Sequence, residues 1–205
     1  MRLKIGTPDQ DRPSFIEAAR RAQIIECAID AIAELGFGQA SLAQIAKRAE
    51  VSTGVISYHF AGKDALIGAV VTHVYVTGGA FIQPRVDIQS GARAALCSYI
   101  AASVGFVAAY PNHARAIMNI ILGGRSELYN PSIEEPRRAA FRRILERGQE
   151  DGVFRRFDVP VMVGTIIGAL NTVPVQLAAT PDIDLDAYGR ELVELFDRAT
   201  RSDAS

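Results

Sequence analysis

Cysteine is scarce in this chain of 205 residues, which contains only Cys27 and Cys97. The two lie far apart, and neither forms part of a CxxC or CxxH pattern. This argues against a disulfide framework and against a cysteine-based zinc site. We therefore expect reduced thiols that pack as small hydrophobic side chains in a cytoplasmic protein.

An excess of either charge is also lacking, because 22 lysines and arginines face 23 acidic residues and the formal net charge is -1. The chain as a whole is not positively charged, so its net charge does not indicate a nucleic-acid partner. Any contact with a nucleic acid must come from a local patch of positive charge. A hydrophobic content of 49% is ordinary for a globular protein with a buried core.

Long uninterrupted hydrophobic runs are missing as well. Pro111 interrupts residues 94 to 114, and residues 159 to 181 carry Asn171, Pro174 and Gln176. Neither is a clean apolar span of about 20 residues, and residues 1–13 lack the apolar region of a secretory signal. We expect no membrane partner, and we expect both runs to be helices of a soluble core or of a subunit interface.

Alternation of polar and apolar residues is absent, whereas the helical period recurs along the chain, which predicts an all-α fold. A first helix is expected over 14–35, with Ile25, Ala28, Ile29, Ile32 and Leu35 in one stripe, ended by Gly36 and Gly38. Gly78, Gly79 and Pro84 predict a break. The other expected helices span 41–49, 53–59, 62–77, 88–110, 112–123, 133–150, 158–178 and 185–200.

The stretch Val51 to Phe60, VSTGVISYHF, carries small and polar residues where a packed helix would carry leucines. Ser41 and Gln44 form a capping box that opens the preceding short helix. Two short helices joined by a three-residue turn match the helix-turn-helix motif, whose second helix enters the DNA major groove.

The residue types on the second helix suit that role. Gly54 has no side chain to hold the helix off a duplex, and Val55 offers apolar contact, whereas Ile56 and Phe60 are expected to point inward. Lys63 begins the next helix, where backbone N–H groups already favour a phosphate. The hydroxyl groups able to contact phosphate oxygens or a thymine methyl belong to Ser52, Thr53, Ser57 and Tyr58.

The local charge supports DNA binding weakly, because residues 41 to 63 carry a net charge of only +2. The second helix has no Arg, Asn or Gln, so DNA shape is expected to matter more than base edges. The alternative is a helical hairpin in which Tyr58 and His59 merely cap the core.

The segment SLAQIAKRAEVSTGVISYHFAGKDAL resembles the DNA-binding segment of the TetR family of bacterial transcription regulators. A second similarity, to the end of that family's seventh helix and the start of its eighth, lies in residues 147–155 followed by Asp158. One departure is Glu50, where the family usually has glycine; a left-handed conformation there would cost on the order of 1 kcal/mol. The family's motif positions correspond to Ser41, Ser52, Thr53, Gly54, Tyr58, His59 and Lys63.

A composition shift, with no lysine after Lys63, places a boundary near residues 78 to 87, although a long connecting helix could make the two parts one rigid body. We therefore expect a flexible arm over 1–13, a DNA-binding domain over 14–78, and an effector-binding and dimerisation domain over 79–205. The resemblance further implies a homodimer formed by the last two helices, although an intrachain core is the alternative reading of their apolar residues. Candidate interface residues are Gly164, Gly168, Thr172, Leu192, Leu195 and Phe196.

The resemblance also implies an effector pocket between the middle helices, for which an apolar or aromatic ligand fits best. Arginines 137, 138, 142, 143 and 147 could neutralise an anion, but the spacing of Glu134, Glu135 and Glu146 favours a salt-bridged solvent face. Candidate pocket residues are Phe106, Tyr110, His113, Met118, Asn119, Leu122, Tyr129, Phe141, Met162 and Asn171.

The implied function is a ligand-responsive repressor that binds a palindromic operator in double-stranded DNA. A transcriptional activator, or a helical small-molecule binder with a vestigial DNA-binding motif, remains the alternative. The chain lacks the HExxH, GxSxG, P-loop and CxxC motifs, so no enzyme and no cofactor is expected. His59, His73 and His113 are too scattered in the sequence to predict a metal site.

Overall fold

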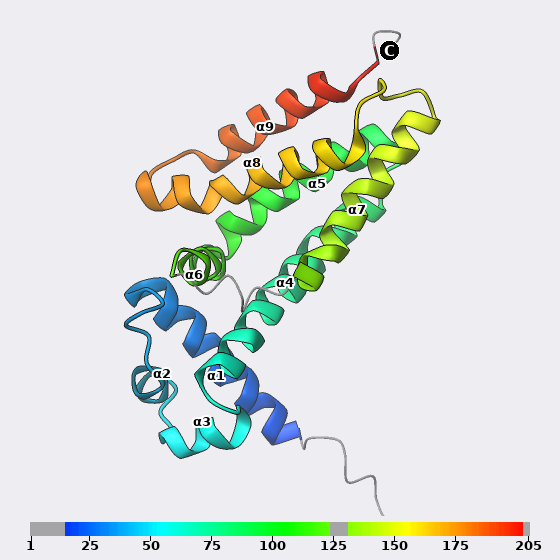
Figure 1. Ribbon diagram of the computed structural model, residues 1–205. Helices are drawn as coiled ribbons and strands as arrows, with labels where there is room; N and C mark the ends of the chain where they lie inside the picture. Colours follow the sequence, from blue (N-terminus) through cyan, green and yellow to red (C-terminus); the bar gives the residue numbers. More distant parts are fainter. Residues whose placement is uncertain (1–14, 124–130, 203–205) are drawn as a thin grey trace, which may run out of the picture.

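The computed structural model describes residues 15–123 and 131–202, and within these ranges the regular structure is helical (Figure 1). This confirms the predicted all-α class. The proposed arm over 1–13 and Tyr129 lie outside the described residues. The helices are α1 (Phe15–Leu35), α2 (Leu42–Arg48), α3 (Thr53–His59), α4 (Lys63–Asp87), α5 (Ala92–Ala109), α6 (Pro111–Leu122), α7 (Pro131–Glu150), α8 (Val159–Ala179) and α9 (Leu185–Thr200).

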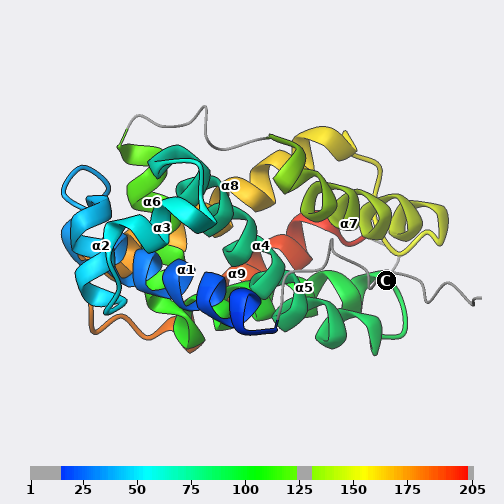
Figure 2. The ribbon, with the colours of Figure 1, turned by 90° about the horizontal axis from the view of Figure 1, so that it is seen from below.

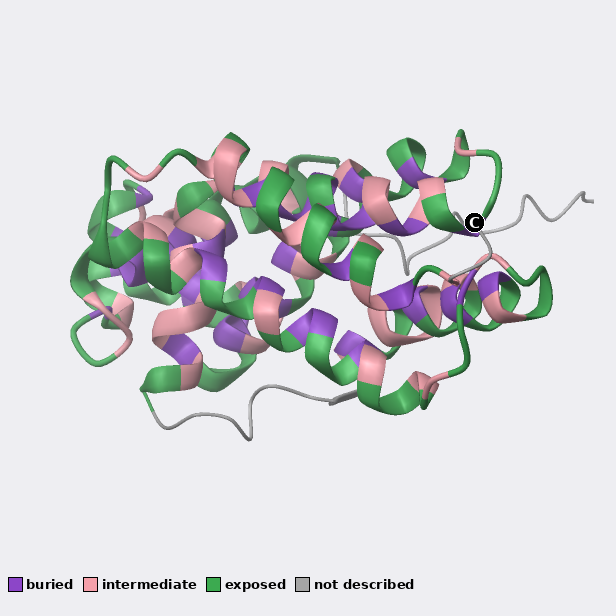
Figure 3. Ribbon diagram, turned by 90° about the horizontal axis from the view of Figure 1, so that it is seen from above, coloured by how far each residue is buried: buried purple, intermediate pink, exposed green. Residues whose placement is uncertain are grey.

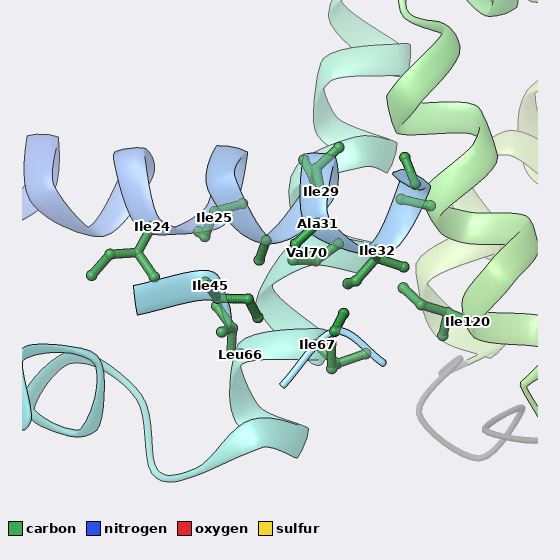
Figure 4. Packing of buried hydrophobic residues seen from close by; sticks show 14 of the residues in the cluster. Ile24, Ile25, Ile29, Ala31, Ile32, Ile45, Leu66, Ile67, Val70 and Ile120 are labelled. Carbon is green, nitrogen blue, oxygen red and sulfur yellow. The ribbon is translucent and has the colours of Figure 1, made fainter. Parts of the chain in front are cut away.

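A first hydrophobic core joins α1, α2 and α3 to the first half of α4 (Figure 4). Ile29 and Ile45 are fully buried in it, and Ile120 of α6 enters it from the other part of the chain. Ile56 and Phe60 are buried here as predicted. Leu35 was expected in the same stripe but is 39% exposed, because α1 ends there and Gly36, at a φ of 78°, turns the chain away.

A side-chain cap opens each of the two short helices, α2 and α3. The Oγ atom of Ser41 accepts a hydrogen bond of 3.2 Å from the Gln44 N–H, and Ser52 Oγ accepts one of 3.3 Å from the Val55 N–H. Glu50, in the turn between α2 and α3, has a φ of 54°, so the left-handed conformation considered for this position is the one that it adopts.

Helix α4 runs without interruption through Gly78, Gly79 and Pro84, so the predicted break there is wrong. Glycine and proline weaken an isolated helix, proline by about 3 kcal/mol or more in a helix interior. Burial outweighs that cost here, because Ile82 and Val86 are packed in a second core and Gly78 lies against the Phe106 ring. The domain boundary proposed at residue 78 therefore falls inside one continuous helix.

The second core is formed by the end of α4 together with α5, α7, α8 and α9. Helices α8 and α9 both lie on the side of the molecule opposite to α3 (Figure 1), and many residues of both are exposed (Figure 3). Two hydrogen bonds of 2.5 and 2.6 Å from Arg93 to the carboxylate of Asp197 fasten α5 to α9. Helix α6 lies between this core and α1 (Figure 1).

Three helices are long and apolar enough to cross a membrane when only length and composition are considered: α4, α5 and α8. Within the chain, 56% of the most apolar window of α5 is buried, but only 28% of that of α8. Helix α8 therefore presents apolar surface that this single chain does not cover.

Candidate DNA-binding and effector sites

Helix α3 exposes one face at the end of the molecule formed by α1 to α3 (Figure 2). Its inner residue, Ile56, is fully buried and anchors the helix on the first core, while Val55 and His59 are half-buried at the margins. The outer face therefore consists of small and hydroxyl-bearing residues, namely Ser52, Thr53, Gly54, Ser57 and Tyr58.

Gly54 leaves the backbone of α3 uncovered on this face. A Cβ atom added there would meet only Ser52 Oγ, at 3.5 Å, which is an ordinary contact. The fold itself does not require glycine at this position. A flat, side-chain-free patch of helix is what a surface needs if another backbone or a nucleic acid is to approach closely.

Two of the hydroxyl groups of α3, those of Ser57 and Tyr58, donate hydrogen bonds within the chain. Ser57 donates a hydrogen bond of 3.1 Å to the Thr53 carbonyl, and the Tyr58 phenol donates one of 3.0 Å to Glu17 Oε1 on α1. The bond to Glu17 raises the pKa of Tyr58. Tyr58 remains 74% exposed, so a ligand can reach its ring and hydroxyl.

Lys63 is the first residue of α4, as predicted, and it has a structural role that the sequence did not reveal. Its Nζ atom donates a hydrogen bond of 3.2 Å to the Phe37 carbonyl and lies 4.6 Å from the centre of the Phe37 ring. The lysine thus ties the start of α4 to the loop after α1.

The positive charge near α3 is modest because Arg48 of α2 is already paired with acidic side chains of α1. Arg48 forms two hydrogen bonds with the Glu34 carboxylate and lies 3.9 Å from Asp30. Lys47 is exposed beside it. The surface around α3 therefore has little net positive charge with which to attract DNA. Its distinguishing features are the bare backbone at Gly54 and the hydroxyl groups beside it.

A cavity of about 470 Å³ lies between α4, α5, α6, α7 and α8. Its walls are mainly apolar, with Val74, Ile117 and Leu170 from three different helices. Arg137 lines it too, donating a hydrogen bond of 3.1 Å to Asn171 Oδ1 and lying 4.0 Å from the buried Glu134. Further polar lining comes from Thr72, Gln83, Tyr99 and Ser103.

Of the ten candidate pocket residues, the structure places Phe106, Met118 and Asn171 in the wall of this cavity. Tyr110 and His113 pack instead towards the first core and α1, Asn119 donates to the Ile32 carbonyl, and Leu122 is 74% exposed. Phe141 is fully buried against the Tyr99 ring, and Met162 packs on the second core. These six described residues do not line the cavity.

Sequence reasoning missed Tyr99, Ser103 and Arg137 as cavity residues. Arg137 was assigned to a solvent face because arginines and glutamates alternate at helical spacings along α7. The spacing defines faces of the helix but does not say which face turns inward. The Arg137 side chain is only 18% exposed, whereas that of Arg142, paired with Glu135, is 46% exposed.

The candidate interface residues separate into two groups. Gly164, Gly168 and Thr172 of α8 and Leu195 of α9 are exposed, and Leu192 is half-buried. Phe196 is only 3% exposed and packs in the second core, so the intrachain alternative is correct for that residue.

Residues 24–70 match the family model described as bacterial regulatory proteins, tetR family. Over 59 residues the chain is 44% identical to the HTH-type transcriptional regulator BetI of Klebsiella pneumoniae, covering 29% of this chain and 30% of that protein. Over 85 residues it is 38% identical to BetI of Burkholderia ambifaria, covering 41% and 44%. The matched segments thus span less than half the length of these relatives.

Solved structures match over nearly the whole chain. The fatty acid degradation regulator FadR from Bacillus halodurans has a TM-score of 0.80 at 21% identity, covering 95% of this chain and 97% of that one. FadR from Bacillus subtilis in complex with stearoyl-CoA has a TM-score of 0.75 at 23% identity, covering 85% and 96%.

A bacterial regulatory protein in the tetR family from Rhodococcus RHA1 has a TM-score of 0.78 at 23% identity, covering 90% of this chain and 98% of that one. At these identities the likeness establishes the fold alone. The N-terminal segment of the chain is thus similar to the bacterial regulatory proteins of the tetR family, and the whole chain shares the fold of these solved structures.

Proposed function

We propose that this protein is a transcriptional regulator that binds a palindromic operator as a homodimer and represses transcription until a small effector releases it. The observation that carries the proposal is the outer face of α3. That face is bare at Gly54, rich in hydroxyl groups, and held rigidly by the buried Ile56. A family match over residues 24–70 supports the same reading.

In the proposed complex, α3 lies in the major groove of DNA. Gly54 allows the helix backbone to approach the base edges, while Thr53 and Tyr58 donate to phosphates on either side. Lys63 at the start of α4 adds a cation where the helix dipole already favours an anion. Because charge contributes little here, close fit to the groove supplies most of the specificity.

A second copy of the chain is proposed to cover α8. Its outer face carries Gly164 and Gly168, where an added Cβ would meet no atom within 4 Å, and Val161 beside them is 66% exposed. Small residues allow two helices to pack closely. The part of each chain formed by α1 to α3 and the start of α4 is called the reading head below. A dimer has two reading heads, one for each half-site of a palindromic operator, and such half-sites lie about 34 Å apart.

The proposed dimer is tested by Gly168→Arg. The free chain has room for the larger side chain, so helicity is expected to remain while the dimer dissociates and operator affinity falls. Analytical ultracentrifugation measures the change in mass. A dimer that persists in this variant would place the interface elsewhere.

For the effector we propose a molecule with a long apolar body and an anionic end. The apolar walls of the cavity fit the body, and the Arg137 guanidinium provides a partner for the anion. A solved structural neighbour, FadR from Bacillus subtilis, is in complex with stearoyl-CoA, a ligand of that general chemistry.

Two helices offer a route from the cavity to the reading head. Helix α4 lines the cavity at Val74 and begins at Lys63 beside α3. Helix α6 lines it at Ile117 and contacts α1 through a 2.8 Å hydrogen bond from Asn119 to the Ile32 carbonyl. An effector that shifts either helix would change the spacing of the two heads, with a coupling of about 1 to 3 kcal/mol.

The proposed function is tested by selecting duplexes from a random DNA library with the full-length protein. Enrichment of one palindromic sequence, bound at least 1000-fold more tightly than unrelated DNA, is the expected result. Enrichment of no sequence above unrelated duplexes would refute the proposal. Addition of the correct effector is then expected to release the selected duplex.

A further inference from the structure

Two of the three histidines, far apart in sequence, meet one carboxylate at the junction of α1, α4 and α6. His73 Nε2 lies 2.8 Å from Glu26 Oε1, and His113 Nε2 lies 3.7 Å from Glu26 Oε2. The ligand atoms of the three residues all lie within 4.8 Å of one another. The expectation that the histidines are too scattered for such a cluster is therefore wrong for this pair.

An ordinary ion pair accounts for only part of this arrangement. The distance of 2.8 Å is that of a hydrogen bond between His73 and Glu26. The distance of 3.7 Å from His113 Nε2 to the other oxygen of the same carboxylate is too long for a hydrogen bond. A shared partner between the three groups would account for the position of all of them.

The distances match the requirements of a small cation with imidazole and carboxylate ligands. In a tetrahedral zinc site, with metal–ligand bonds of about 2.0 to 2.2 Å, neighbouring ligand atoms are roughly 3.4 Å apart. The three atoms here span separations from 2.8 Å to at most 4.8 Å. Small rotations of His73 and Glu26, whose side chains are partly exposed, would be needed to bring all three separations to that value.

The surroundings hold His113 in place and leave a path for an ion. The His113 side chain is 12% exposed and packs edge-on against the Tyr110 ring, with centroids 5.2 Å apart. His73 and Glu26, whose side chains are 30% and 48% exposed, open the site to solvent.

We propose that Glu26, His73 and His113 bind a divalent transition-metal ion of the zinc type, with solvent completing the coordination. Two imidazoles and one carboxylate are a ligand set that zinc accepts. Magnesium prefers oxygen ligands and retains its water, so it is not expected to bind here.

A bound ion would join α1 and α4, which belong to the reading head, to α6 beside the effector cavity. Its effect on DNA affinity rests on the proposed function. Metal binding itself does not, so it is measured on the free protein, and the two ideas can fail independently.

The test is calorimetric titration of zinc into the metal-free full-length protein at pH 7.5. We expect one ion per chain, and we expect His73→Ala and His113→Ala each to weaken binding at least 10-fold. The third histidine provides a matched control, since His59→Ala, measured in the absence of DNA, is expected to leave zinc affinity unchanged. Glu26→Gln retains the shape of the carboxylate and is also expected to weaken binding.

Thermal unfolding provides a second readout that does not depend on heats of mixing. Zinc is expected to raise the unfolding temperature of the wild type but not that of His113→Ala, and magnesium is expected to raise neither. A lack of zinc binding by the wild type would overturn the site. Equal losses in His59→Ala and His73→Ala, or loss of binding in Cys27→Ser, would overturn it as well.

Discussion

The phenol of Tyr58 on α3 donates a hydrogen bond of 3.0 Å to the carboxylate of Glu17 on α1. A residue proposed to contact DNA is therefore bound to an acidic side chain in the free protein. This anion lies at the edge of the proposed DNA-binding surface. It holds the tyrosine in place, but it also opposes the approach of phosphates.

Replacing Glu17 by Gln is therefore expected to strengthen operator binding about three- to tenfold at 50 mM salt, because one like charge is removed from the interface. The gain should shrink as salt rises. Glu150→Gln, at the exposed end of α7 remote from α3 (Figure 1), is the matched control and is expected to change nothing. Fluorescence anisotropy with the selected duplex measures both; a gain that is independent of salt would contradict a charge effect.

Lys63→Met removes one ammonium from each chain but keeps an unbranched apolar stem. If each Lys63 contacts one phosphate, the slope of log affinity against log salt is expected to become less steep by about 0.9 per chain. Arg190→Met, on the exposed part of α9, removes a positive charge away from α3 and serves as the control, for which the slope is expected to stay the same. An unchanged slope would mean that Lys63 contacts no phosphate and that its role is the structural contact with Phe37.

Glu50 adopts a left-handed conformation at a φ of 54° without the freedom of glycine. Glu50→Gly is expected to raise the free energy of unfolding by about 1 kcal/mol, partly offset by the greater entropy of glycine in the unfolded chain. Glu50→Ala removes the same charge but keeps the Cβ atom, so it should bring no such gain. Urea denaturation distinguishes them, and equal stability of the two variants would mean that no backbone strain is relieved.

Arg137→Met tests the anionic end of the effector. Affinity for a long-chain acyl carboxylate or acyl-CoA is expected to fall at least 10-fold, while affinity for an uncharged analogue of the same length should change little. Arg142→Met removes a salt-bridged arginine from the exposed face of the same helix and is expected to leave both affinities intact. Equal losses for the charged and uncharged ligands would show that Arg137 acts by shaping the cavity.

The Arg93–Asp197 contact predicts how stability depends on pH. Hydrogen bonds from Arg93 lower the pKa of Asp197 below its ordinary value of 3.8. A carboxylate whose pKa is lower in the folded state stabilises the protein above its unfolded pKa, and that contribution is lost as the pH falls through the folded value. Asp197→Asn should therefore be less stable than the wild type at pH 7, and the difference should narrow below pH 4. A difference that is constant from pH 7 to pH 3 would rule out this linkage.

The features that the sequence predicted well depend on neighbours along the chain. The cap at Ser41 and the ends of α3 are set within a few residues, so local patterns are sufficient. The break predicted at Gly78 failed because burial of distant parts of α4 holds the helix together.

The cavity and the histidine cluster could not be predicted in the same way. Arg137 lines the cavity because α7 turns that face towards α4 and α8, and no spacing within α7 contains this information. His73 and His113 meet because α4 and α6 both contact α1. Tertiary packing decides both cases.

The central claim, that the bare face of α3 enters the DNA groove, is tested most directly by measuring both folding and operator binding of Gly54→Ala and Gly54→Leu. Space is open at Gly54, so both variants are expected to fold, and the alanine is expected to add up to about 1 kcal/mol of helix stability. Affinity for the selected duplex is expected to fall at least 10-fold with alanine and further with leucine. Full affinity in a stably folded Gly54→Leu would contradict the account.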